Sequence, residues 1–190
     1  GMGLVFKAHR ADQEYQQEVA IKVLPHRFSR LQDLLNGRRE RQILADLQHP
    51  NISRLLDGGT DKHGHPYLVM EYVKGIPITQ YCDEHHLNIQ QRCHFILQLC
   101  DALSYAHGNL IIHRDIKPSN VLIDANGALK LLDFGIAVLL DQQHDVEIPL
   151  TPRYASPEQL QGKVCTVASD IYSLGLVTHE TICGLSLIHI

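Results

Sequence analysis

The fold of this chain is decided by the polar stretch His113-Arg114-Asp115-Ile116-Lys117-Pro118-Ser119-Asn120 and by the later Asp133-Phe134-Gly135. The first stretch interrupts an otherwise apolar region, and upstream a lysine stands within the apolar run Val19-Ala20-Ile21-Lys22. Each motif alone is compatible with an ordinary loop whose carboxylates cap turns. All three together, in this order and spacing, form a linked set that chance rarely produces.

An antiparallel sheet is expected to start the chain. Apolar-rich runs at 4–8 and 18–24 flank a polar turn, which is typical of a hairpin with a longer loop. Two more strands are expected at 52–56 and 67–73, on either side of a turn at 58–65. Between the two hairpins, apolar residues recur at helical spacing over 29–47 and predict a helix.

The pattern changes to helix after Lys74-Gly75, which is the only credible boundary between two lobes. A capping box is expected at 88–91, and one apolar stripe predicts a buried helix from there to about His107. Short strands are expected at 121–123 and 129–132, around a turn at Asn126-Gly127. A second helix is expected after Ser169.

Composition limits the class of protein. A chain of 190 residues is one domain or two small lobes, and 44% hydrophobic with 20% charged residues excludes intrinsic disorder. The net charge of -4 offers no basic field for nucleic acid or anionic lipid. The 5 cysteines form no Cys-x-x-Cys motif. We therefore expect neither a disulfide framework nor a zinc site, and a reducing, cytoplasmic compartment.

The most apolar stretch, at 171–190, carries Glu180 and two histidines. These polar groups favour a buried core helix over a membrane span. The start of the chain has none of the features of a signal peptide, and we expect none.

With these motifs the chain resembles the eukaryotic-like serine/threonine protein kinases of bacteria over residues 1–184. The sequences at 55–59 (Leu-Leu-Asp-Gly-Gly) and at 150–159 resemble those of bacterial members of the family. The resemblance implies an α+β, two-lobed protein-kinase fold. Its N-lobe (1–72) holds an antiparallel sheet and one helix, its hinge spans 71–75, and its C-lobe (76–184) is mostly helical and truncated. The implied activity is transfer of the γ-phosphoryl group of Mg-ATP to Ser or Thr hydroxyls of protein substrates.

The resemblance also implies roles for individual polar residues. Asp115 is expected to be the catalytic base or hydroxyl-orienting carboxylate, and Lys117 to neutralise the transferring phosphoryl group. Asn120 and Asp133 are expected to hold Mg²⁺, which takes oxygen ligands. In this family a lysine two residues after the base accompanies Ser/Thr rather than Tyr specificity.

A second group of positions matches the ATP-binding residues of the family. Glu40 matches the glutamate that pairs with Lys22, although it is also describable as a surface charge among neighbouring arginines. Glu71 and Val73 are expected to offer backbone groups to adenine. The full set is Gly3, Val5, Ala20, Lys22, Glu40, Met70, Glu71, Val73 and Leu122.

Other matched positions are structural. Four residues resemble the family's stacked apolar spine, although each is equally describable as ordinary core: Leu44, Leu55, His113 and Phe134. Asp170 matches the aspartate that braces the catalytic loop. Ser156 replaces the alanine that is usual in the family's Ala-Pro-Glu motif.

Two other functions remain open. A pseudokinase scaffold requires loss of a catalytic group, and none of the expected groups is missing. A small-molecule phosphotransferase shares the spacing of Asp115 and Asn120 but usually lacks the Lys117 and Ser156-Pro157-Glu158 features. Metal binding by His63 and His65, or by the run 82–86, is disfavoured because these residues fit a turn and a helix end.

Both ends are expected to be incomplete relative to the family, with the first strand, two loop glycines and the later C-lobe helices absent. Flanking sensor or repeat domains are compatible with this expectation. The last residues, 185–190, are one translation of CTGTCTCTTATACACATC, a transposon end sequence used as an adapter. We expect them to be non-native, and the preceding helix to continue into different sequence.

Overall fold

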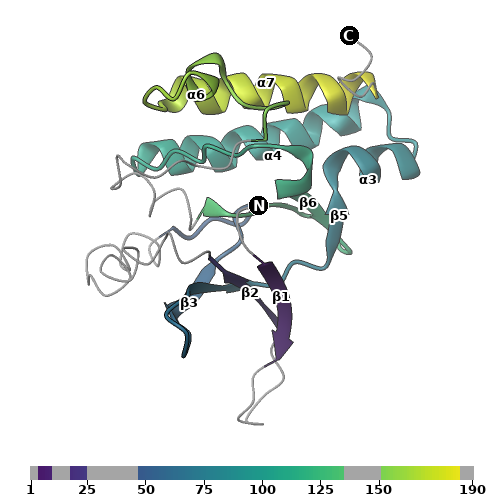
Figure 1. Ribbon diagram of the computed structural model, residues 1–190. Coiled ribbons are helices and arrows are strands. Elements are labelled where there is room, and N and C mark those ends of the chain that lie inside the picture. The colour runs from purple at the N-terminus through teal and green to yellow at the C-terminus, as the bar shows by residue number, and fades with distance from the viewer. Residues whose placement is uncertain (1–3, 10–17, 25–46, 135–150, 185–190) are drawn as a thin grey trace.

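A four-stranded antiparallel sheet forms the N-terminal part of the computed structural model, which describes residues 4–9, 18–24, 47–134 and 151–184. Its strands are β1 (Leu4–His9), β2 (Glu18–Val23), β3 (Leu55–Thr60) and β4 (Pro66–Glu71), in the order β1-β2-β4-β3. The sheet lies on one side of the molecule and the long helices lie on the other (Figure 1). This arrangement confirms the expected two-lobed α+β fold.

One of the expected hairpins differs in its turn. The turn was predicted at 58–65, but Gly58 and Gly59 continue strand β3 and pair with Leu68 and Tyr67. The prediction was wrong because pairing with β4 outweighs the preference of glycine for turns. The chain reverses at Asp61 instead, where one carboxylate oxygen accepts the backbone N–H groups of His63 and His65, each at 2.8 Å.

A second, smaller sheet lies between the N-terminal sheet and the helices (Figure 1). It consists of β5 (Gly75–Pro77), β6 (Val121–Asp124) and β7 (Leu129–Leu131), in that order. The turn expected at Asn126-Gly127 is confirmed, and Gly127 adopts a φ of 77° that suits glycine. Strand β5 was not predicted, because three residues ending in proline carry no alternating pattern.

The helices are α3 (Ile78–Glu84), α4 (Ile89–Gly108), the 3-10 turn η2 (Pro118–Asn120), α6 (Pro157–Leu160) and α7 (Val167–Cys183). The predicted capping box is present, with Asn88 accepting the N–H of Gln91 and the Gln91 side chain accepting the N–H of Asn88. Helix α7 begins before Ser169 because the Thr166 side chain caps it at Val167. Helices α4 and α7 run alongside each other (Figure 1).

The segment before β3 is fastened to the smaller sheet. Ile52, which is fully buried, forms a parallel bridge with Leu131. Asn51 donates from its side chain to the carbonyl of Leu129 at 2.9 Å, and Ser53 donates its N–H to Leu131 at 2.9 Å. The N-terminal sheet is thereby held against strands β6 and β7.

Helix α7 ends at Cys183. Gly184 adopts the left-handed conformation and donates its N–H to the carbonyl of Glu180 at 3.1 Å, which closes the last turn. Arg92 from α4 donates to the carbonyl of Thr181 at 2.7 Å. The expectation that the native helix continues into different sequence after Gly184 concerns residues outside the described ones and stays a prediction.

Several expectations fall outside the described residues. These are the predicted helix over most of 29–47, the tail at 185–190, and the residues Gly3, Glu40 and Leu44.

Of the apolar stretch, the described residues 171–183 belong to α7 and pack in the core as expected, since Val177 is fully buried. Within the described ranges, no helix has the length and apolar character needed to cross a membrane. All five cysteines lie within the described residues, and none of them forms a disulfide bond.

Candidate active site

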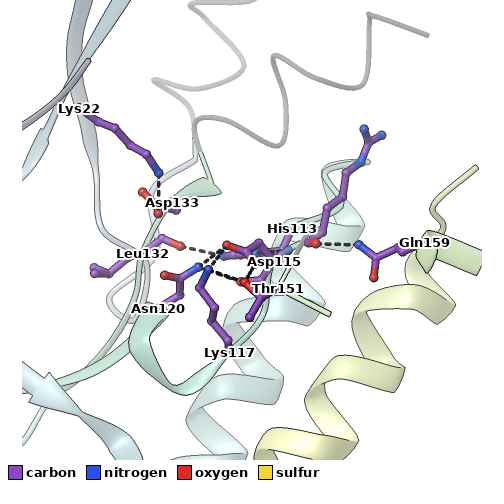
Figure 2. Close-up of polar contacts among 10 residues, drawn as sticks. Lys22, His113, Asp115, Lys117, Asn120, Leu132, Asp133, Thr151 and Gln159 are labelled. Carbon is purple, nitrogen blue, oxygen red and sulfur yellow. Dashed lines mark hydrogen bonds and ion pairs between the residues drawn. The ribbon is translucent and has the colours of Figure 1, made fainter. Parts of the chain in front are cut away.

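Asp115 lies at the centre of a group of polar side chains on the loop between α4 and β6. Its Oδ2 accepts from the amine of Lys117 at 2.6 Å and from Nδ2 of Asn120 at 3.1 Å. Figure 2 shows these side chains converging on Asp115. The turn η2 brings them together, because it folds Asn120 back so that its amide also reaches the Asp115 carbonyl at 2.8 Å.

A hydroxyl group completes this cluster. Thr151 donates to Oδ1 of Asp115 at 3.2 Å and accepts from the Lys117 amine at 2.9 Å. A carboxylate and an ammonium therefore contact one hydroxyl oxygen at once. This is the arrangement that a base and a neutralising cation need around an acceptor hydroxyl.

Lys22 and Asp133 form the second polar group of the site. The Lys22 amine lies 2.8 Å from Oδ2 of Asp133, with side-chain exposures of 4% and 21%. A lysine this buried requires an anionic partner. The structure supplies that partner from the strand-to-loop junction after β7, while the expected pairing with Glu40 lies outside the described residues.

The donors of Asn120 and Asp133 suit a hard cation. The Asn120 Nδ2 is used by Asp115, so its oxygen is the atom left to act as a ligand. With the Asp133 carboxylate it offers the oxygen donors that Mg²⁺ prefers, and Mg²⁺ commonly uses only one or two protein ligands together with substrate phosphates. The residues present therefore fit the expected metal.

Backbone geometry at the site is supported by Asp170, a fully buried carboxylate. It accepts the N–H groups of His113 at 2.7 Å and Arg114 at 2.8 Å, and it contacts Nε2 of His107 at 2.8 Å. Arg114 and Asp133 adopt φ values of 68° and 72°. Such left-handed residues other than glycine are costly and concentrate at functional sites. The expected bracing role of Asp170 fits this geometry.

His113 connects the two motifs. Its Nε2 lies 2.7 Å from the carbonyl oxygen of Leu132, which can only accept, so Nε2 carries the proton. Its Nδ1 then accepts the N–H of Asp115 at 3.2 Å. The His113 ring also meets Phe134 edge to face, with centroids 4.7 Å apart. Two members of the expected spine are therefore in contact.

The residues expected near adenine lie on the facing strands. Val5 on β1 pairs with Lys22, and Ala20 on β2 pairs with Met70 on β4. The Glu71 carboxylate forms an ion pair with Lys130 at 3.1 Å. The adenine contact expected of Glu71 involves its backbone and not this carboxylate. Leu122 lies on β6 and Val73 follows β4.

The segment after Thr151 carries two groups with shifted pKa. Burial, and then a hydrogen bond to Glu180 at 2.6 Å, raise the pKa of the Tyr154 phenol well above its usual range. The Ser169 hydroxyl, donating to Glu158, lowers the pKa of that carboxyl. Both contacts tie this segment to α7.

The histidines weighed as metal ligands have other contacts in the structure, as His85 does with the carbonyl of Tyr81. In the ranges that the structure describes, no three His, Cys, Asp or Glu residues are grouped so that they could hold a metal ion. His65 contacts Asp61 through Nδ1 at 3.2 Å, which helps to close the turn. Burial raises the pKa of the Cys82 thiol, which disfavours the thiolate needed for metal binding.

Three residues with a place in this site are absent from the predicted set. Thr151 stands within the segment 150–159 that carries the resemblance, but its contact with Asp115 arises only in the fold. His107 has no local signal. Gln159 stands three residues after Ser156, which is capping-box spacing, but its bond to the Arg114 carbonyl at 2.7 Å is a tertiary contact.

The geometry agrees with comparisons to known proteins. A sequence model described as protein kinase domain matches residues 1–189. The chain belongs to the protein kinase family. This kinase domain is 38% identical over 189 residues to the serine/threonine-protein kinase PrkC of Bacillus subtilis, covering 97% of this chain and 29% of PrkC. It is also 38% identical to the serine/threonine-protein kinase PknB of Mycobacterium leprae, covering 97% of this chain and 31% of PknB.

A solved structure has the same fold. The crystal structure of the Mycobacterium tuberculosis PknI kinase domain matches with a TM-score of 0.71 at 28% identity, covering 96% of this chain and 70% of that chain. The chain spans about a third of the length of the curated relatives PrkC and PknB. Protein kinases in general use ATP and Mg²⁺.

Proposed function

We propose that this kinase domain transfers the γ-phosphoryl group of Mg-ATP to Ser or Thr hydroxyls of protein substrates. The observation that carries the proposal is the contact of one threonine hydroxyl with both Asp115 and Lys117. It supports a site in which an aliphatic hydroxyl is bonded by the base and the cation together. The names of the bacterial relatives point to the same acceptor class.

Asp115 and Lys117 act on the reacting atoms. The acceptor hydroxyl donates its hydrogen bond to Asp115, so its oxygen lone pair is turned toward the γ-phosphorus. As the new O–P bond forms and the bond to ADP breaks, the hydroxyl proton passes to Asp115. Lys117 neutralises charge on the transferring group, which is the larger part of catalysis in this chemistry.

Asn120 and Asp133 are proposed to hold Mg²⁺, which when bound neutralises phosphate charge. Lys22 on strand β2 lies beside Asp133. We propose that it binds the nucleotide phosphates from the side of the N-terminal sheet. The proposed adenine contacts are Val5, Ala20, Met70 and Leu122, with the backbone of Glu71 and Val73. Gly3 and Glu40 remain predictions, as do the boundaries of the two lobes and the hinge at 71–75.

We also propose a cytoplasmic location for this domain. Five cysteines without a disulfide bond among them support a reducing compartment. Sensor or repeat domains flanking the kinase domain remain a prediction.

A transfer assay tests the proposed activity. The chain is incubated with Mg-ATP labelled at the γ-phosphate and a general protein substrate, and phosphoamino acids are separated. Phosphoserine or phosphothreonine is expected in the wild type and at least about 100-fold less in Asp115→Asn, because the base is lost. Asp124→Asn, which changes a carboxylate that caps the β6–β7 turn, is the control.

Label only on tyrosine, or only on a small-molecule alcohol such as an aminoglycoside, would contradict the proposal. ATP binding without any transfer would favour a pseudokinase scaffold instead.

A further inference from the structure

Gln159 connects the short helix α6 to the catalytic loop. Its Nε2 donates to the carbonyl oxygen of Arg114 at 2.7 Å. Gln159 is only 5% exposed, so this bond is shielded from water. Figure 2 shows Gln159 reaching the loop from the side opposite Asn120 in this view.

The carbonyl that Gln159 holds belongs to the peptide group joining Arg114 to Asp115. The N–H of the same peptide group donates to Nδ1 of His113 at 3.2 Å. Both polar atoms of this one peptide group are therefore bonded, one by Gln159 and the other by His113. The orientation of this peptide group sets the direction in which the Asp115 side chain leaves the backbone.

Arg114 is a position that needs such support. Its φ of 68° lies in the left-handed region, which non-glycine residues rarely occupy without help from their surroundings. Asp170 holds the N–H of Arg114 at 2.8 Å, and Gln159 holds its carbonyl. The unfavourable conformation is thus fixed from two different helices, α7 and α6.

We propose that Gln159 is a positioning residue for phosphoryl transfer, which fixes the Arg114–Asp115 peptide group and thereby aims Asp115 at the acceptor hydroxyl. The inference rests on the proposed function, because that function gives Asp115 its acceptor. Gln159 contacts no reacting atom. Its effect passes through the backbone of the catalytic loop.

The Gln159 side chain also takes part in the capping box of α6, and a control has to distinguish that contribution from the bond to Arg114. Oε1 of Gln159 accepts the N–H of Ser156 at 2.9 Å, and the Ser156 hydroxyl accepts the N–H of Gln159 at 3.4 Å. Ser156→Ala removes the hydroxyl half of this capping box and leaves both side-chain bonds of Gln159 in place. Alanine is also the usual residue of the family's motif at this position, which makes Ser156→Ala a suitable matched control.

The first test compares steady-state kinetics of the full chain as wild type, Gln159→Leu and Ser156→Ala. Gln159→Leu should lower kcat about tenfold with an unchanged KM for ATP, because a small misplacement of a reacting group is costly to rate but not to nucleotide binding. Ser156→Ala should stay within about twofold of wild type. Equal kcat values for Gln159→Leu and wild type would overturn the inference alone. Absence of transfer by the wild type would overturn the proposed function, and the inference with it.

The second test uses Gln159→Glu, which preserves side-chain length and the acceptor for Ser156. An ionised carboxylate cannot donate to the Arg114 carbonyl, but a protonated carboxyl can. The kcat of this variant, divided by that of wild type at each pH, should rise several-fold from about pH 8 to about pH 6, since burial favours the protonated form. The ratio cancels the titration of the ionisable groups that the two proteins share. A ratio that does not change with pH, or that falls, would overturn the positioning role.

Discussion

The amine of Lys22 lies 2.8 Å from Oδ2 of Asp133, although 111 positions of sequence separate the two residues. Lys22 comes from the N-terminal sheet and Asp133 from the end of the smaller sheet, so this ion pair crosses between the two lobes. Both side chains are largely removed from water. The pair therefore places a cation and a carboxylate together at the expected phosphate and metal positions.

Lys22→Met should abolish most phosphoryl transfer. Loss of a charged group that stabilises the transition state removes several kcal/mol, so kcat/KM should fall at least about 100-fold. Asp133→Asn should have an effect of the same order. Steady-state transfer to a protein substrate measures both variants.

Lys7→Met is the matched control for Lys22→Met. Lys7 pairs with Glu18 at 2.6 Å, but both side chains are 43% exposed, and such surface pairs contribute little. Its kcat/KM should stay within about twofold of wild type. Wild-type turnover in both Lys22→Met and Asp133→Asn would show that these residues are not part of the site.

The Thr151 hydroxyl should matter for catalysis. Thr151→Ala removes its bonds to Asp115 and Lys117, so these side chains lose a partner that fixes their orientation. We expect kcat to fall about tenfold, whereas Thr151→Ser should keep most of the activity because the hydroxyl remains. Single-turnover transfer rates distinguish the two variants. If Thr151→Ala and Thr151→Ser have equal rates, the hydroxyl has no role.

Gly75 should tolerate no side chain. A Cβ at this position in β5 would lie 2.5 Å from the carbonyl oxygen of Ile123 on β6. This distance is too short for a contact, so the backbone of β5 or β6 would have to move. We expect Gly75→Ala to destabilise the fold by about 2 kcal/mol, at the upper end of ordinary substitutions. Thermal or urea unfolding measures the change.

The comparison for Gly75→Ala is Gly175→Ala. Gly175 lies within α7, and nothing is within 4 Å of its added Cβ. This substitution should stabilise the chain by about 1 kcal/mol, because alanine favours helix over glycine. Equal effects of the two substitutions would contradict the close approach of β5 to β6.

Alkaline unfolding should depend on Tyr154. Its pKa is raised in the folded state by burial and by the hydrogen bond to Glu180. The unfolded chain therefore loses the phenol proton first, and folding stability that is fully present below about pH 10 declines as the pH rises above it. Tyr154→Phe should unfold about 1 kcal/mol more easily at neutral pH but lose less stability above pH 10.

Tyr172→Phe is the control for this measurement, since Tyr172 is 44% exposed. Unfolding free energies from urea titrations at neutral pH and above pH 10 provide the comparison. A steeper alkaline decline in Tyr154→Phe than in wild type would refute the assignment.

Much of the fold was predictable from local patterns. The Asn88 capping box, the apolar stripe of α4 and the Asn126-Gly127 turn each arise within a few residues, and each is present in the structure. Where the predictions were wrong, tertiary contacts outweighed a local preference. Gly58 and Gly59 stay in β3 because β4 supplies partners for their backbone groups.

The sequence by itself determined the family, because the identities and order of Asp115, Lys117, Asn120 and Asp133 match the protein kinase motifs and predict a base, a cation and oxygen ligands. Only the tertiary structure decided how these groups are held. The left-handed φ of Arg114 has no sequence signal, since it is stabilised by Asp170 and by Gln159, which lies 45 positions away. Contacts of this kind leave no periodicity in the chain, because the hydrogen bonds that form them depend on how separate helices and strands pack.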